Sequence, residues 1–245
     1  MKKLIVNKYL KAFGFELHGT GYMQSLRKSS FQDNAFDKQK EMITGRPSCV
    51  FDVGANRGDV ALKYHSLFPS TAIYAFEPFI TSFETLQSNV KGIPHIHCFQ
   101  KALSDSKGVF KMYVNKNIDT NSLLKPQKMG LSSDNEVKNV STLEVEATTI
   151  DDFCAANNIH EIDILKLDIQ GGELAALKGA NKLLASKKIE LIYTEAYFKQ
   201  QYENQPLFYE IAEYLKGYNY FLQDLYNPIY GKGSIAWCDA IFLPQ

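Results

Sequence analysis

The ten residues VFDVGANRGD, numbered 50–59, decide the fold of this chain. An apolar run ends at Val53, glycines follow at Gly54 and Gly58, and a helical pattern begins near Asp59. Gly54 suits a tight turn with unusual φ, and Gly58 suits the close approach of a ligand to the backbone, because a Cβ obstructs both. A strand that passes through a glycine-rich turn into a helix is where doubly wound α/β sheets bind nucleotides.

Short apolar runs and amphipathic helical stretches alternate downstream of this segment, which is the βαβ pattern of a parallel sheet covered on both faces. We expect strands at Cys49–Val53, Thr71–Phe76, His97–Leu103, Ile162–Asp168, Ile189–Thr194, Tyr218–Leu225 and Ile235–Leu243. The Asn227-Pro228 and Gly231–Gly233 loop suits a hairpin, so the last strand should run antiparallel. The sequence therefore predicts an α/β fold with a doubly wound, mostly parallel seven-stranded sheet and an antiparallel last strand.

Two segments depart from this alternation. Residues 1–47 show no strand pattern, and Ser29–Ile43 is polar and compatible with a helix. We expect a helical N-terminal appendage at 1–47 and one main domain at 48–245. Between Ser104 and Val140 the chain is polar, apart from a strand-like run at Val109–Val114, and a stretch of this length suggests a functional insertion. The appendage and the insertion are predicted to cover the ligand site as a lid.

The composition excludes several classes of protein. Lys plus Arg and Asp plus Glu both total 27, so no global charge gathers a phosphate backbone, and nucleic acid is not expected as a partner. The N-terminus lacks the apolar core of a signal peptide, and no apolar run reaches the roughly 20 residues of a membrane span. Four scattered cysteines without a C-x-x-C pair are expected to be reduced thiols. These features predict a cytoplasmic enzyme.

The glycine spacing favours a cofactor without phosphate. A dinucleotide fingerprint places a glycine where this chain has Asn56, and Asp59 near the helix start would repel a pyrophosphate. S-adenosylmethionine (SAM) has no phosphate and carries a positive sulfonium and an ammonium group, which Asp52 at the strand end would favour. Glu77, 23 positions after Gly54, is placed to accept both ribose hydroxyls.

Four motifs in order carry a family resemblance: FDVGANRGD at 51–59, FEP at 76–78, KALSD at 101–105 and LKLDIQGGE at 165–173. Through them the chain, from about Ser48 to Glu195, resembles the FkbM family of SAM-dependent methyltransferases. The resemblance implies the class I methyltransferase fold and O-methylation of a sugar hydroxyl or a secondary metabolite. The family's usual K-x-D-x-E-G-x-E pattern has a glutamate where this chain has Gln170, so one carboxylate is missing.

The sequence and the resemblance together predict a cofactor site, in which residues 102–104 cover the adenine edge by resemblance. The predicted cofactor-binding residues are Asp52, Gly54, Ala55, Asn56, Gly58, Glu77, Pro78, Ala102, Leu103, Ser104 and Asp168.

The predicted catalytic residues are Asp168, Lys166 and Glu195. Lys166 and Asp168 are two apart in a strand and therefore share a face, and Glu195 ends the next strand. Lys166 either helps to deprotonate the acceptor or forms a buried ion pair with Asp52. Asp168 is expected to act in proton removal, or instead to hold the SAM amino group. No metal is expected, since only Asp168 and Glu195 converge.

The methyl acceptor is expected above the same sheet edge, contacted by Asn121, Ser122 and Tyr197. Other candidate aromatic contacts are Tyr193, Phe198, Tyr226 and Tyr230. The predicted function is a SAM-dependent O-methyltransferase that acts on a small molecule or a glycan. The alternatives are a SAM-binding module without catalysis, a nucleotide-dependent oxidoreductase or epimerase, and methylation of an amine.

Overall fold

The computed structural model describes residues 34–127, 137–231 and 233–245. Its helices are α3 (Ala35–Met42), α4 (Asp59–Leu67), α5 (Ile80–Asn89), α6 (Ile150–Ala156), α7 (Glu173–Lys178), α8 (Asn181–Ala185) and α9 (Phe208–Gly217), with a 3₁₀ turn, η1, at Ile118–Thr120. Its strands are β1 (Cys49–Val53), β2 (Ala72–Phe76), β3 (Ile96–Phe99), β4 (Ala102–Leu103), β5 (Gly108–Asn115), β6 (Asn139–Thr148), β7 (Ile162–Leu167), β8 (Ile189–Tyr197), β9 (Tyr220–Gly231) and β10 (Ser234–Pro244).

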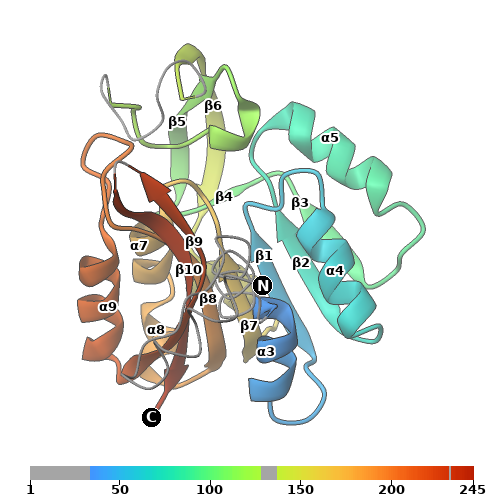
Figure 1. The fold of residues 1–245 in the computed structure, drawn as a ribbon. Coiled ribbons are helices and arrows are strands. Elements are labelled where there is room, and N and C mark those ends of the chain that lie inside the picture. Colours follow the sequence, from blue (N-terminus) through green and yellow to red (C-terminus); the bar gives the residue numbers. More distant parts are fainter. Residues whose placement is uncertain (1–33, 128–136, 232) are drawn as a thin grey trace, which may run out of the picture.

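Seven strands form the main sheet in the order β3-β2-β1-β7-β8-β10-β9 (Figure 1). The neighbours from β3 to β8 pair in parallel, whereas β10 pairs antiparallel with both β8 and β9. The predicted doubly wound sheet with an antiparallel last strand is confirmed. The predicted loop before β10 is largely strand, because β9 continues through Asn227-Pro228 as far as Gly231.

The central strands are apolar on both sides because helices cover both faces of the sheet. All five residues of β1 are buried. Phe51 and Val53 face a core shared with α6, α7, α8 and α9, while Val50 faces a second core shared with α3, α4 and α5. Side chains that alternate along one strand thus fill two cores, as expected in a three-layer α/β/α arrangement. Figure 1 shows the two helix groups on opposite sides of the sheet.

The predicted strand His97–Leu103 is wrong as a single element. Gln100 and Lys101 interrupt its apolar run, and the Lys101 N–H donates to the carbonyl of Phe99 (2.9 Å), which turns the chain. The residues before the turn form β3 in the main sheet. Those after it form β4, whose Ala102 pairs with Ala147 of β6 in a separate sheet.

The predicted polar insertion, Ser104–Val140, contains β5 and the first two residues of β6 in this second sheet, whose order is β4-β6-β5. The strand-like run at Val109–Val114 is part of β5, which pairs antiparallel with β6. The sheet has its own small apolar core around Met112 and Val145. In Figure 1 it lies at the top of the view, beyond the ends of the main strands.

Helix α3 packs against the main domain. Asn34 caps its first turn by accepting from the Phe36 N–H (3.1 Å), and the ring of Phe36 meets those of Tyr64 and Tyr193 edge to face. The hydroxyl of buried Tyr64 donates to Gln39 (2.7 Å). The rest of the predicted appendage, residues 1–33, lies outside the described residues. No helix in the described ranges has the length and apolar character needed to cross a membrane.

Candidate active site

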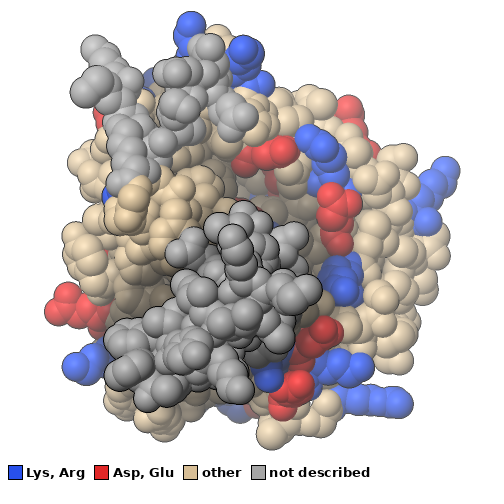
Figure 2. All heavy atoms as spheres, in the orientation of Figure 1, with Lys and Arg blue, Asp and Glu red and all other residues tan. Residues whose placement is uncertain are grey.

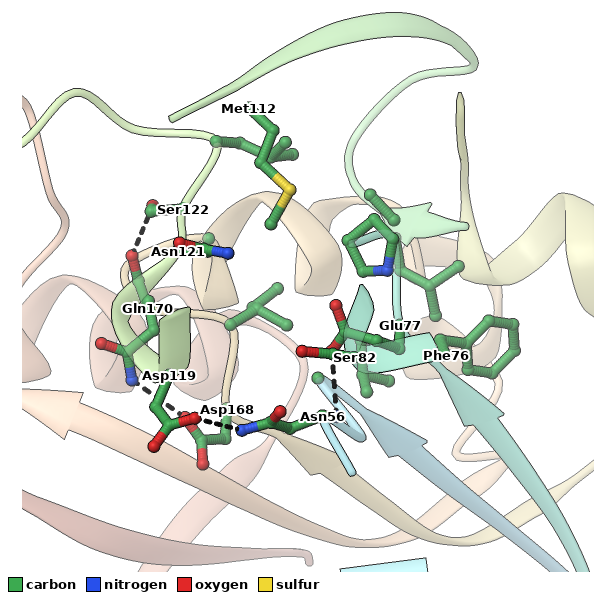
Figure 3. A pocket seen from close by; sticks show the side chains of 18 of the residues that line it. Asn56, Phe76, Glu77, Ser82, Met112, Asp119, Asn121, Ser122, Asp168 and Gln170 are labelled. Carbon is green, nitrogen blue, oxygen red and sulfur yellow. Dashed lines mark hydrogen bonds between the residues drawn. The ribbon is translucent and has the colours of Figure 1, made fainter. Parts of the chain in front are cut away.

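A cavity of about 330 Å³ lies where the main strands end and the three-stranded sheet begins (Figure 3). We call it the larger cavity. Its lining residues are Val53, Gly54, Asn56, Phe76, Glu77, Pro78, Ser82, Lys101, Ala102, Leu103, Met112, Ile118, Asp119, Asn121, Ser122, Leu123, Asp168, Ile169, Gln170, Gly172 and Glu195. It therefore occupies the carboxyl edge of the sheet, where doubly wound folds bind ligands.

The turn after β1 forms part of the cavity wall. Gly54 has φ +77°, and a Cβ built on it would lie 1.9 Å from the backbone oxygen of Asp168. Only glycine therefore allows the end of β1 to lie this close to the segment that follows β7. Gly58 serves a different contact from the predicted one: a Cβ there would lie 2.7 Å from Leu86 Cδ1, so this glycine lets α5 pack closely and does not line the cavity.

Glu77 follows β2 and points into the larger cavity (Figure 3). One carboxylate oxygen accepts from the Asn56 N–H (2.9 Å) and the other from the Phe79 N–H (2.8 Å). Burial raises the pKa of the Glu77 carboxyl to about 7, although these two hydrogen bonds act in the opposite direction. The side chain is thus fixed in place and retains lone pairs for a ligand that donates hydrogen bonds.

Two buried polar atoms from cavity-lining residues have no hydrogen-bond partner among the residues that the structure describes: Asn56 Oδ1 and Asn121 Nδ2. Buried polar atoms in native proteins are nearly always paired, so these two indicate a ligand or water. Apolar atoms line another part of the cavity, from Phe76, Pro78, Ala102, Leu103 and Met112. A carboxylate, a free acceptor, a free donor and an apolar wall fit the ribose, the polar groups and the adenine of SAM.

Lys166 and Asp52 form a buried ion pair behind the cavity. Lys166 Nζ lies 3.0 Å from Asp52 Oδ1 and also donates to the carbonyl oxygens of Gly54 (2.9 Å) and Val53 (3.3 Å). Burial acts to lower the pKa of Lys166, but Asp52 and then Asp168 outweigh it, so the pKa is raised. Lys166 therefore remains charged and stabilises the turn at Gly54. Of the two predicted roles of Lys166, the structure shows the buried ion pair with Asp52.

Gln170 connects the polar groups on the other side of the cavity. Its Nε2 donates to Asp168 (3.1 Å) and to Glu195 (2.9 Å), while its Oε1 accepts from the hydroxyls of Tyr197 (3.2 Å) and Tyr202 (3.0 Å). Only an amide donates to two carboxylates and accepts from two hydroxyls at once, because an ionised glutamate has no donor. The departure from the family pattern therefore fits the surroundings of this side chain.

Asp168 and Glu195 lie on either side of the Gln170 amide. Asp168 follows β7 and its side chain is about half exposed (47%). Glu195 lies inside β8, two positions before the last residue of the strand, because β8 is longer than the predicted strand. Burial, and secondly the charge of Asp168, raise the pKa of Glu195 well above its ordinary value.

The structure brings most of the predicted site residues together. The predicted residues that line the larger cavity are Gly54, Asn56, Glu77, Pro78, Ala102, Leu103, Asn121, Ser122, Asp168 and Glu195. Those that do not line it are Asp52, Ala55, Gly58, Ser104, Lys166 and Tyr197. Sequence reasoning missed Ser82, Met112, Asp119 and the bonding role of Gln170. For Met112 the alternation of residues 109–114 was an available signal, because Met112 and Val114 face the same side.

The other candidate aromatics are dispersed. Tyr193 is buried and donates to Asp239 (2.7 Å), while Phe198 stacks on Phe208. Tyr226 is buried and Tyr230 is 64% exposed. No group of three or more His, Cys, Asp or Glu in the part of the chain that the structure describes is placed to hold a metal ion.

The strand order, the glycine turn after β1, the acidic residue after β2 and the carboxylate after β7 define a class I, SAM-dependent methyltransferase. The model of the methyltransferase FkbM domain matches residues 52–222, most of the chain. The chain therefore belongs to the FkbM methyltransferase family, and the predicted family, fold and cofactor are confirmed. This membership argues against the oxidoreductase alternative.

Two curated relatives bear names that specify oxygen methylation. The 2-O-methyltransferase NoeI of Sinorhizobium fredii is 26% identical over 162 residues, which cover 64% of this chain and 66% of that protein. The 31-O-demethyl-FK506 methyltransferase FkbM of Streptomyces tacrolimicus is 28% identical over 181 residues, covering 65% and 69%. A solved methyltransferase FkbM from Methylobacillus flagellatus has a TM-score of 0.49 at 16% identity, covering 80% of this chain and 43% of that one. The chain thus matches about two thirds of the curated relatives' length.

Proposed function

We propose that this protein transfers the methyl group of SAM to a hydroxyl oxygen of a sugar, a glycan or a secondary metabolite. The observation that carries the choice of oxygen is the pair of carboxylates, Asp168 and Glu195, at the larger cavity. A hydroxyl gives up its proton reluctantly, and a nearby carboxylate accepts that proton as the new bond forms. The names of the two curated relatives support the same chemistry.

The larger cavity would hold SAM through residues already fixed in place. Glu77 would accept the ribose hydroxyls, and Ala102 and Leu103 would contact the adenine edge. Asp168 and the nearby turn at Gly54 would hold the positively charged methionine part. When bound, SAM supplies a methyl carbon that the acceptor oxygen takes by in-line displacement, so that a C–O bond forms, a C–S bond breaks and S-adenosylhomocysteine leaves.

We assign proton removal to Glu195. Glu195 lines the larger cavity, and Gln170 Nε2 donates to one of its oxygens (2.9 Å), which fixes the orientation of the carboxylate that would accept the proton. Lys166 cannot take this role, because Asp52 keeps it protonated. Asp168 then contributes mainly to cofactor binding, the second of its two predicted roles.

The proposal includes a small-molecule or glycan acceptor and a cytoplasmic location. On the face drawn in Figure 2, described side chains of both charges are interspersed, which supports an acceptor other than nucleic acid. We further propose that Ser29–Ile43 and the insertion around Asn121 cover the bound cofactor. Hydrogen exchange should slow in both segments when SAM is added, and equal exchange with and without SAM would contradict a covering role.

Binding and transfer are tested separately. Calorimetry should detect SAM and S-adenosylhomocysteine but not NAD. Turnover is then followed as S-adenosylhomocysteine release with neutral sugars, phenols and amines as acceptors, and NMR identifies the methylated atom. We expect the methyl group on oxygen.

Three outcomes would overturn the proposal. Binding of NAD without SAM would exclude this class of enzyme, and a methyl group on nitrogen would exclude oxygen as the acceptor atom. SAM binding without product from any acceptor class would favour the module without catalysis.

A further inference from the structure

A second cavity, of about 230 Å³, lies next to the larger one. Its lining residues are Asp119, Thr120, Val137, Gln170, Glu195, Tyr197, Gln201 and Trp237. Asp119, Gln170 and Glu195 line both cavities. A ligand in the larger cavity and a ligand in the second one would therefore meet at these three side chains. Of the two shared carboxylates, Asp119 already pairs with Arg57 (3.0 Å), which leaves Glu195 available for chemistry between the cavities.

Tyr197 and Trp237 contribute the aromatic part of the lining, and we call this space the aromatic cavity. The two residues are direct partners in the antiparallel pairing of β8 and β10. Their rings stack with centroids 5.9 Å apart at an angle of 29°, and the Tyr197 hydroxyl donates to Gln170. The sheet therefore holds a rigid, flat apolar surface beside the proposed proton acceptor.

Gln201 provides an independent indication of a ligand. It lines the aromatic cavity, it is 6% exposed, and its Oε1 is buried with no hydrogen-bond partner within the described ranges. Its backbone is fixed, since the Gln201 N–H donates to Gln205 Oε1 (2.6 Å) and its carbonyl accepts from the Gln127 N–H (3.0 Å). A buried acceptor held in this way requires a donor from a ligand or water.

Charge and size restrict that ligand. The described residues around the cavity include two carboxylates and neither lysine nor arginine, which disfavours an anion. A volume of about 230 Å³ is below the range of about 300–1,000 Å³ that holds drug-sized molecules, so a single ring fits better than a large scaffold. Side-chain amides, a carboxylate and an aromatic face together match a ring that carries several hydroxyls on an apolar framework.

We propose that the aromatic cavity binds the methyl acceptor as one neutral sugar ring that lies against Trp237, donates a hydroxyl to Gln201 and presents another to Glu195. The inference rests on the proposed function and specifies its substrate class. It adds Trp237, Gln201 and Thr120 to the acceptor contacts predicted from the sequence.

The chain offers a direct test, because Trp237 is its single tryptophan. Its fluorescence is titrated with methyl β-glucopyranoside, methyl α-mannopyranoside and methyl α-rhamnopyranoside, in the presence of S-adenosylhomocysteine. At least one should give a saturable change in emission and protect Trp237 from acrylamide quenching. Gln201→Leu should weaken that binding by about 2- to 12-fold, the range for one neutral hydrogen bond. Tyr209→Ala, an exposed aromatic on α9, is the matched control and should bind as the wild type does.

Activity provides a second measurement if Gln201→Leu does not fold. Trp237→Ala should raise KM for the responding pyranoside by about 2- to 12-fold or more, with unchanged SAM affinity, while Trp237→Phe should largely restore KM. Catechol is titrated in the same way as a planar aromatic alternative. No response to any pyranoside, a response to catechol alone, or equal pyranoside affinity in folded Gln201→Leu would overturn the sugar site.

Failure of this inference is distinguishable from failure of the proposed function. SAM binding and methyl transfer to a hydroxyl other than a sugar would leave the proposed function standing without the sugar site. Pyranoside binding at Trp237 without methylation of any oxygen would leave the sugar site standing and refute the proposed function.

Discussion

Replacing Glu77 tests the cofactor site where its geometry is best defined. The two carboxylate oxygens of Glu77 accept from the backbone N–H groups of Asn56 and Phe79, and the residue is only 7% exposed. Losing hydrogen bonds to a buried carboxylate costs about 1 to 3 kcal/mol. Glu77→Ala should therefore weaken SAM binding by about 5- to 160-fold at 25 °C.

The pKa of about 7 adds a pH dependence with a definite sign. The ribose hydroxyls donate hydrogen bonds, so they favour the ionised carboxylate. In the free protein at pH 6 only about one tenth of Glu77 is ionised, and the apparent affinity falls by that fraction. SAM should thus bind about tenfold more weakly at pH 6 than on the plateau above pH 8, with affinity lost as the pH falls through about 7.

Calorimetry at pH 6 and pH 8.5 measures both effects, and in two buffers with different ionisation heats it also detects the released proton. Glu77→Gln should flatten the pH dependence in this range. Glu84→Gln, on the exposed face of α5, is the control and should behave like the wild type. Wild-type affinity at pH 8.5 in a folded Glu77→Ala protein would remove Glu77 from the site, and an unchanged pH slope in Glu77→Gln would refute its titration.

Three further predictions follow from the geometry. Gly54→Ala forces an alanine into the left-handed conformation, which costs about 1 to 2 kcal/mol, and places its Cβ 1.9 Å from the Asp168 backbone oxygen. The urea midpoint of this variant should therefore drop clearly, whereas Gly217→Ala, whose Cβ meets nothing within 4 Å, is the control. Equal midpoints in the two variants would contradict the close approach. Glu195→Gln should lower kcat by about 10²- to 10⁴-fold with little change in SAM affinity, whereas Asp168→Asn should mainly weaken SAM binding. The opposite pattern would make Asp168 the base. Burial raises the pKa of Glu173 from 4.5 to about 7, so the folded state binds its proton more tightly and the free energy of unfolding should fall as the pH rises through that window. Urea midpoints at pH 5 and pH 8 should differ less in Glu173→Gln, and an identical difference would exclude this group.

Much of the candidate site could be predicted from the sequence, because it depends on the chemistry of single residues at the ends of strands. The turn at Gly54 requires glycine because of its φ, and a carboxylate after the second strand of such a sheet is placed at the ligand-binding edge, so the positions of both residues at the cavity were predictable. The parallel sheet followed from strands that are apolar on both sides, such as β1 and β7. Gly58 shows the limit of this reasoning, because spacing alone did not reveal that a Cβ at this position would meet Leu86 of α5.

The sequence alone determined the fold class, the family and the cofactor, because each depends on residues close together in the chain or on a regular repeat of apolar positions. Only the tertiary structure decided which carboxylates remain available to bind the cofactor or accept a proton. It pairs Asp52 with Lys166 across two strands, and it inserts the Gln170 amide between Asp168 and Glu195. It also places Trp237 beside Tyr197 through a strand pairing 40 residues apart in the sequence. Such contacts depend on register and side-chain direction between distant segments, which local patterns do not encode.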